Sequence, residues 1–140
     1  MIVEPMTKEH YRQLALQPAQ MSVGGRITDA VLDVLLQWPA YAAIVDGEVV
    51  GVGGVVEHHR LRAHAWALFS AKVGTAMVSI VRAIRRFILV CGYARVETTV
   101  VCDHVEGHRL AKMLGFVCEC DRMVGYGEDG EDQAMYRWAR

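Results

Sequence analysis

The segment Ser70–Met77, with the sequence SAKVGTAM, connects a β-rich stretch to the most strongly amphipathic stretch of the chain. Its small residues expose main-chain N–H groups at the start of a helix, where the positive end of the helix dipole attracts anions. Such a corner suits a pyrophosphate, and Lys72 could add a positive charge. The alternative is a tight connection without a ligand, because one glycine and two alanines are weak evidence.

Histidine and glutamate side chains close to this segment could transfer protons. The alternation of a strand places four side chains on the face that reaches the loop, namely His64, Trp66, Leu68 and Ser70. A histidine whose pKa lies near the operating pH suits a general base, but His64 could equally be a half-buried strand residue bonded to a neighbour. Glu57, followed by His58 and His59, is the second candidate, although three adjacent ionisable residues usually form a solvated loop.

Two further histidines, His104 and His108, are one helical turn apart, so they could meet a common ligand or simply lie on the surface of a short helix. We predict no metal site, because adjacent strand residues such as those at 57–59 point to opposite faces. Two of the four cysteines, Cys118 and Cys120, are expected on one face of a strand. Buried free thiols in a reducing cytoplasm are the favoured interpretation, over metal ligands or disulfides.

The composition limits the class of protein. With 140 residues, 53% hydrophobic and 22% charged, the chain fits one domain with a sizeable core, and intrinsic disorder is excluded. A formal net charge of −1 gives no reason to propose a nucleic acid or a membrane surface as partner. The N-terminal residues become polar before any apolar run forms, so no secretory signal is expected and a cytoplasmic location is predicted.

Local signals predict an alternation of strands and helices in a mixed α/β domain. In the first half, Thr7 and Thr28 are expected to cap helices, Pro39 to end the second helix, and Asp46-Gly47 to form a hairpin turn. The glycines at 51, 53 and 54 predict a bulge or a close backbone approach. The predicted elements are Ile2–Pro5 (strand), Lys8–Leu16 (helix), a loose stretch over 17–25, a helix after Thr28, and the strands Tyr41–Val45, Glu48–Glu57 and Leu61–Ser70.

In the second half, the spacing of apolar residues predicts a helix over 75–91 that stops at Gly92. Asp103 and Glu106 have the spacing of a capping box and predict the start of a short helix that ends at Gly115. A terminal hairpin is expected to carry Tyr136 and Trp138, which could build a dimer face. The predicted strands are Arg95–Cys102, Phe116–Tyr126 and Asp132–Trp138.

The element order, together with the segment DHVEGHRLAKMLGF at 103–116, resembles the GCN5-related N-acetyltransferase (GNAT) superfamily across nearly the whole chain. The cofactor loop of that family usually reads Gln/Arg-x-x-Gly-x-Gly/Ala, and here Ala71 takes the first place while Gly74 and Ala76 match. The late helix usually reads Asn-x-x-Ala, then Tyr, then Gly-Phe. This chain has His104, Gly107 and Ala111 at the first three places and matches at Gly115 and Phe116.

The resemblance implies a GNAT-like fold, with a mixed, mostly antiparallel central sheet and helices on both faces. It also implies acetyl-CoA as acyl donor and a primary amine as acceptor. His64, on the strand that enters the loop, would be the base and Glu57 the reserve. A strand N–H near Leu68 would polarise the thioester, and the main chain of Leu68 and Ser70 would bind pantetheine. The cofactor-binding residues implied are Leu68, Phe69, Ser70, Ala71, Lys72, Val73, Gly74, Thr75, Ala76, His104, His108 and Ala111.

The chain also resembles small GNAT-like proteins of podovirus-type lytic phages, some of which are named internal virion or virion-assembly proteins. The stretches AWALFS and HRLAKMLGF carry this resemblance. It implies a rival hypothesis: a non-catalytic virion-assembly or host-interaction protein, located in the host cytoplasm or the virion, that kept the fold. A third hypothesis is a module that binds CoA without turnover. A homodimer or a phage or host protein partner stays open.

Overall fold

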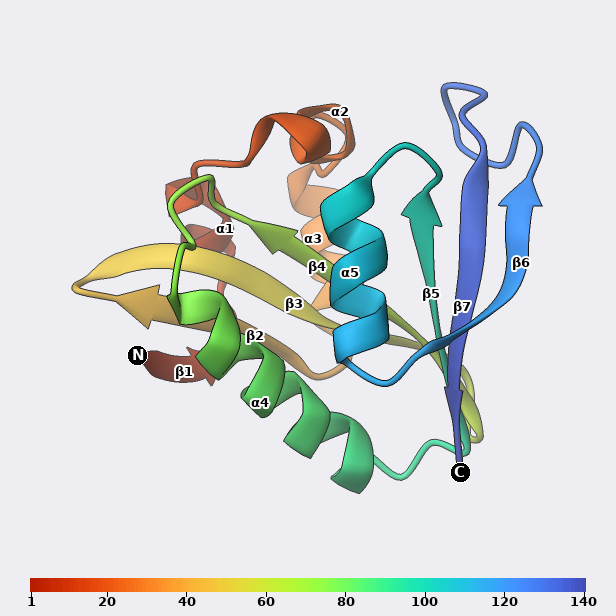
Figure 1. Ribbon diagram of the computed structural model, residues 1–140. Helices are drawn as coiled ribbons and strands as arrows, with labels where there is room; N and C mark the ends of the chain where they lie inside the picture. The colour runs from red at the N-terminus through yellow and green to blue at the C-terminus, as the bar shows by residue number, and fades with distance from the viewer. The chain divides into compact units, whose positions relative to one another are not determined.

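The computed structural model describes residues 1–140, apart from the side chains of Ser22 and Val23. Figure 1 shows the strands and helices of the chain. The strands are β1 (Ile2–Pro5), β2 (Ala40–Val45), β3 (Glu48–His59), β4 (Arg62–Phe69), β5 (Arg95–Val101), β6 (Val117–Met123) and β7 (Gln133–Ala139). The helices are α1 (Lys8–Gln13), the 3₁₀ turn η1 (Pro18–Gln20), α2 (Met21–Gly24), α3 (Asp29–Leu35), α4 (Ala76–Val90) and α5 (Val105–Met113).

The seven strands form one mixed sheet in the order β1-β2-β3-β4-β5-β7-β6. Strand β4 pairs with β5 in parallel, whereas β1–β2, β2–β3, β5–β7 and β6–β7 are antiparallel pairs. The predicted mixed, mostly antiparallel α/β fold is therefore confirmed. By its contacts the chain divides into two compact units, residues 1–57 with 65–80 and residues 58–64 with 81–140. That these units act as a single domain stays a prediction.

The first unit is built around the β2–β3 hairpin and the short helices beside it. Asp46 and Gly47 form its turn with φ values of 50° and 77°, as the Asp-Gly pair predicted. The N-terminal caps of α1 and α3 are also confirmed, because Thr7 accepts from the His10 N–H and Thr28 from the Val31 N–H. A buried apolar cluster that includes Leu32, Val52 and Leu68, with Trp66 packed against it, holds this unit together.

Helix α1 ends earlier than predicted. It stops at Gln13 rather than Leu16, because Leu14 adopts an extended backbone and Leu16 forms an isolated antiparallel bridge with Ser70. The stretch 17–25, predicted to be loose, contains η1 and α2. Pro18 at the start of η1 suits a helical first position, since it has no N–H to satisfy. The chain after α1 is therefore held against the end of β4.

Glycines in β3 permit close backbone contacts, as predicted. The register of β2 and β3 shifts between Ala43 and Ile44, which marks a bulge in β3 at Val50, next to Gly51. A Cβ at Gly53 would lie 2.8 Å from the Trp66 carbonyl oxygen, and a Cβ at Gly54 would lie 2.4 Å from that of Pro39. Only glycine lets these strands approach so closely.

The second unit contains β5, β7, β6 and α5, and α5 contacts β5 (Figure 1). Val96 and Ala134 are fully buried in it, and Phe116 is 5% exposed. The capping box predicted from Asp103 and Glu106 is wrong, because His104 is the N-cap of α5 and makes no capping hydrogen bond with its side chain. Helix α4, which belongs to both units, ends before Gly92, whose φ of 86° is typical of a helix terminus.

The cysteines correct two predictions. A register shift on β6 pairs Cys118 with Tyr136 and Cys120 with Met135, so the two thiols face opposite sides of the sheet rather than the same side. The bulge adds one residue, and this reverses the alternation that the sequence suggested. All four cysteines are free, but they are half-buried or, for Cys120, exposed rather than buried. Among the described residues, no helix is long and apolar enough to cross a membrane.

The close approach at Gly54 gives a stability prediction. Gly54→Ala should lower the free energy of unfolding by about 1–3 kcal/mol, because the added methyl group meets main-chain atoms of Pro39 and Ala40 that cannot move aside. Denaturant unfolding measures the effect. Gly47→Asn is the control, since that turn has no atom within 4 Å and asparagine tolerates a positive φ. Equal stability of the Gly54→Ala variant and the unmodified protein would contradict this packing.

Candidate functional site

Within the second unit, β4 pairs with β5 in parallel at Arg62–Arg95, Ala63–Val96 and His64–Glu97. The end of β4, residues 65–69, belongs to the first unit. Main-chain N–H and C=O groups that leave a ladder must find other partners, because burying them unpaired is costly. The end of β4 is therefore a place where a ligand or another segment can pair with the strand.

In the first unit, the segment 17–20 pairs with this edge of β4. The Gln17 N–H donates to the Phe69 carbonyl at 2.9 Å. The Gln20 carboxamide makes two further bonds: its Nε2 donates to the Ala67 carbonyl at 2.9 Å, and its Oε1 accepts from the Phe69 N–H at 2.8 Å. The Ala67 carbonyl and the Phe69 N–H thus bind a carboxamide in the way that they would bind the main chain of a neighbouring strand.

This pairing corrects the predicted role of Leu68 and Ser70. The Ser70 N–H donates to the Val50 carbonyl of β3 at 2.9 Å. Because successive residues of a strand point their main-chain groups to opposite edges, Leu68 shares that direction. The odd-numbered residues Ala67 and Phe69, not Leu68 and Ser70, therefore present their main chain at the other edge. Phe69 was among the predicted cofactor residues, whereas Ala67 was missed.

The loop between β4 and α4 lies in the same unit. Gly74 has a φ of 49°, which favours glycine, and the Lys72 N–H donates to Ser70 Oγ at 3.0 Å. The N–H groups of Val73, Ala76 and Met77 bond within the turn. Within the part of the chain that the structure describes, no hydrogen bond from the N–H groups of Gly74 and Thr75 is found.

Lys72 is exposed at this loop and forms an ion pair with Glu48 at 3.3 Å. An exposed pair of this kind is weak, so the lysine can exchange Glu48 for an anionic ligand at small cost. The predicted loop residues Ala71, Lys72, Val73, Gly74, Thr75 and Ala76 therefore form a turn that could hold a phosphate through main-chain groups.

His64 lies at the last pair of the β4–β5 ladder, opposite Glu97. Its ring is half-buried and makes an edge-on contact with His58, with 6.3 Å between the ring centroids. Burial lowers the pKa of His64 below its usual 6.5; the positive charge of a protonated His58 lowers it further, and Glu97 opposes both. A neutral imidazole at pH 7 suits a proton acceptor.

Glu57, the reserve base, lies in β3 next to His58, and adjacent strand residues point to opposite faces. Glu57 therefore does not share the side of β3 on which His58 meets His64. Its side chain is exposed, as are those of His58 and His59. His59 accepts from the Leu61 N–H at 3.2 Å, which stabilises the β3–β4 turn. This agrees with a solvated turn more than with a catalytic cluster.

The predicted cofactor residues of α5 belong to the second unit. Both ring nitrogens of His108 already have hydrogen-bond partners within this unit. Its Nε2 donates to the Cys102 carbonyl at 2.9 Å, and its Nδ1 accepts from the Tyr136 hydroxyl at 2.7 Å. Its ring therefore anchors α5 to β7 and to the end of β5. Tyr136 is 3% exposed, so its expected place on a dimer face is wrong.

His104 and Ala111 complete the predicted set on α5. Ala111 is 3% exposed and packs inside the unit, so a side chain as large as tyrosine would not fit without rearrangement. Gly107 is explained by contact: a Cβ there would lie 2.7 Å from Val100 Cγ1 and 2.8 Å from His104 Cδ2. His104 Nδ1 is buried and has no hydrogen-bond partner among the described residues. Cofactor contacts of His104 and Ala111 stay predictions.

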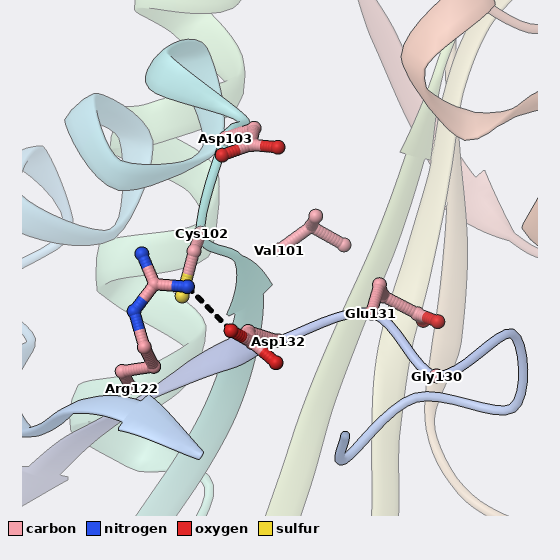
Figure 2. A pocket seen from close by; sticks show the side chains of 7 residues that line it. All are labelled: Val101, Cys102, Asp103, Arg122, Gly130, Glu131 and Asp132. Atoms are coloured by element: carbon pink, nitrogen blue, oxygen red, sulfur yellow. Dashed lines mark hydrogen bonds and ion pairs between the residues drawn. The ribbon is translucent and has the colours of Figure 1, made fainter. Parts of the chain in front are cut away.

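A polar pocket of about 280 Å³ lies in the second unit, where β5 ends and the β6–β7 loop returns (Figure 2). Figure 2 shows Arg122 directed at Asp132, an ion pair of 2.5 Å, with Cys102 beside it. Asp132 also accepts from the Gly125 N–H, and these contacts lower its pKa. The carboxylate of Asp132 is therefore already paired, with Arg122 and with the Gly125 N–H. Its residues are Val101, Cys102, Asp103, Arg122, Gly130, Glu131 and Asp132.

Comparison with solved structures identifies the fold. The chain is similar to Ard1 from Thermoplasma volcanium (18% identity, TM-score 0.76) and to an N-acetyltransferase from Staphylococcus aureus Mu50 (10%, 0.76), covering 99% of this chain and 96% of each of theirs. It is also similar to an acetyltransferase of the GNAT family from Bacillus anthracis (12%, 0.71), covering 98% of this chain and 93% of that one. The fold is that of the GNAT acetyltransferases. No family model and no curated protein matches the sequence.

Besides Ala67, three residues with contacts described above were not predicted in these roles from the sequence: Gln20, Glu97 and Tyr136. Gln20 acts across 49 residues of sequence from Phe69, so no local pattern could reveal it. Glu97 could have been found, because a parallel neighbour of His64 must come from the next Val/Thr-rich strand. Tyr136 donates to His108 from a strand that the sequence placed at the surface.

The environment of His64 predicts its titration. Its ring should titrate below pH 6.5 in the folded protein, as measured by NMR. His58→Ala removes a neighbouring positive charge and should raise the pKa, whereas Glu97→Gln removes a negative charge and should lower it. Because the unfolded chain binds the proton more tightly, His64 makes the folded state less stable as pH falls through 6.5. Titration of His64 above 6.5 would contradict this environment.

The Tyr136–His108 contact predicts a second effect on stability. Tyr136→Phe should lower the free energy of unfolding by about 1–2 kcal/mol, because it leaves His108 Nδ1 without its donor inside the unit. Thermal or urea unfolding measures the loss. Tyr126→Phe is the matched control, since Tyr126 is 54% exposed and should change stability little. Equal effects of the two substitutions would show that the contact is not stabilising.

Proposed function

We propose that this protein is an acetyl-CoA-dependent N-acetyltransferase that acts on a primary amine. The observation that carries the proposal is the end of β4, where Ala67 and Phe69 present main-chain groups that bind a carboxamide. The glycine-containing turn at 70–76 follows directly and leads into α4. An amide-binding strand edge followed by a turn suited to phosphate matches the two ends of a CoA molecule.

The residues present fit CoA without a family-specific side chain at Ala71. The amides of pantetheine would pair with the Ala67 carbonyl and the Phe69 N–H, as the Gln20 carboxamide does. The N–H groups of Gly74 and Thr75 would donate hydrogen bonds to the pyrophosphate, and Lys72 would supply positive charge. When bound, acetyl-CoA supplies a thioester carbonyl that an amine attacks with release of the thiol.

His64 would act as the base. Because its pKa is lowered, the ring is neutral near pH 7 and can take a proton from the ammonium form of the acceptor. The main chain of β4 would hold the reacting groups in position, and most of the rate acceleration would come from that positioning. Direct attack forms no covalent enzyme intermediate, so none of the cysteines needs a catalytic role.

A non-catalytic role is the second candidate, and specific observations favour it. Ala111 is buried where the family often has a tyrosine, so the usual proton donor to the departing thiol is missing. Both ring nitrogens of His108 form hydrogen bonds within the second unit, to Tyr136 and to Cys102. A phage virion-assembly or host-interaction protein that kept the fold, acting in the host cytoplasm or the virion, would show both features. A CoA-binding module without turnover would show them as well.

Thermal unfolding with CoA and with acetyl-CoA separates these candidates. A ligand that binds only the folded state at 100 times its Kd stabilises it by about 2.7 kcal/mol, which corresponds to a rise in Tm of roughly 10 °C. No rise in Tm with millimolar CoA or acetyl-CoA would exclude both the enzyme and the CoA-binding module, so that only the virion-assembly or host-interaction role would remain. A rise without thiol release across a panel of amines would leave the binding module.

If turnover is seen, His64→Ala should lower kcat/KM by roughly 10²- to 10⁴-fold and remove the acidic limb of the pH profile. That limb should lie below pH 6.5 in the unmodified enzyme, because protonation of His64 abolishes the base. Gln13→Ala is the control and should keep full activity, because Gln13 is exposed and its side chain donates to Glu9. An unchanged pH profile in His64→Ala would reject His64 as base.

A further inference from the structure

The Gln20 carboxamide presents its N–H and C=O to one edge of β4, as the N–H and C=O of one residue in a parallel neighbouring strand would. Its Nε2 donates to the carbonyl of Ala67 and its Oε1 accepts from the N–H of Phe69, two residues further along β4. A neighbouring β-strand pairs with residues i and i+2 of its partner in this way. The side chain therefore satisfies one donor and one acceptor on the edge of β4 that faces away from β3.

The orientation of this carboxamide is fixed by its partners. The Ala67 carbonyl can only accept and the Phe69 N–H can only donate, so Nε2 and Oε1 cannot be exchanged. Gln17 Nε2 donates to the same Oε1 at 2.9 Å, and the Gln17 N–H donates to the Phe69 carbonyl at 2.9 Å. Both glutamines flank or belong to η1, a single 3₁₀ turn of three residues. The half-buried side chain of Gln20 is thus aligned along the strand edge by three hydrogen bonds.

We infer that Gln20 is a built-in competitor for the amide-binding edge of β4, which the pantetheine arm of CoA must displace. This inference rests on the proposed function, since it concerns the site assigned there to CoA. One N–H and one C=O cannot make the same short bonds with two amides at once, so binding of the arm and docking of Gln20 exclude each other. The protein without cofactor keeps its strand edge satisfied, and the affinity for CoA is reduced by the fraction of molecules in which Gln20 is docked.

The displacement is physically small. The helical segment that must yield is the single turn η1, and its Pro18 and Ala19 are exposed, so little apolar surface is lost when the turn moves. The released carboxamide regains hydrogen bonds to water, which makes the exchange nearly balanced. Gln20 therefore tunes the affinity for the cofactor arm and does not block it.

Calorimetric titration of Gln20→Ala tests the inference. Removing the competitor should lower the Kd for CoA by roughly tenfold, because two net hydrogen bonds no longer have to be broken. Adenosine 3′,5′-bisphosphate, which lacks the pantetheine arm, should bind both proteins equally. Gln13→Ala, which removes a carboxamide that donates to the exposed Glu9, should leave the Kd for CoA unchanged.

The outcomes are distinct. If the unmodified protein binds CoA and Gln20→Ala binds it with the same Kd, the competition is refuted while the proposed function stands. If neither protein binds CoA at millimolar concentration, the proposed function fails and the competition with it. An equal gain in affinity for the adenosine bisphosphate would also refute the competition, because that ligand has no amide to place on β4.

A measurement on the unmodified protein covers the case in which Gln20→Ala folds poorly. The side-chain NH₂ resonances of Gln20 should show slow solvent exchange in the free protein and fast exchange at saturating CoA, as measured by NMR. Gln13 provides the internal reference, since its NH₂ should not respond. Gln20 resonances that stay protected at saturating CoA would overturn the inference.

Discussion

The edge of β4 at Ala67 and Phe69 faces away from β3, and much of the candidate site follows from the main-chain groups that must be satisfied there. In the first unit the segment 17–20 satisfies the groups of Ala67 and Phe69. The early end of α1, the bridge between Leu16 and Ser70, and the turn η1 all bring that segment to the strand edge. The pairing requirement of one strand thus explains why the chain after α1 is ordered.

The alternation of a strand also decides which groups are available at that edge. Ser70 points its N–H at β3, so Leu68 does as well, and only Ala67 and Phe69 face the other way. The sequence predicted the strand, its side-chain faces and the turn after it, because these depend on local patterns. It did not predict the main-chain direction correctly, since the edge that a residue faces depends on which neighbour it pairs with. Without knowledge of the Ser70–Val50 bond, the sequence is equally consistent with the main chain of residues 68 and 70, or of residues 67 and 69, facing that edge.

Departures from the family pattern on α5 have packing explanations in the second unit. Gly107 allows the helix to approach Val100 more closely than alanine would, Ala111 is buried, and His108 bonds to Tyr136 and to Cys102. These contacts are long-range in sequence, so residue type alone could not distinguish them from cofactor contacts. The bulge between Cys118 and Cys120 is a similar case, because one inserted residue reverses a face that spacing alone had assigned. Caps, turns and the element order were predictable, whereas side-chain pairing across the chain was not.

The proposed function requires that a CoA molecule lies along β4 and the turn at 70–76. Hydrogen–deuterium exchange of the main-chain amides, with and without saturating CoA, tests this without any substitution. If CoA binds there, exchange should be slower in peptides that cover residues 69–76, where the Phe69, Gly74 and Thr75 N–H groups would bond to the ligand. Unchanged exchange over 69–76, with protection confined to residues 101–103 and 122–132 around the polar pocket, would contradict it.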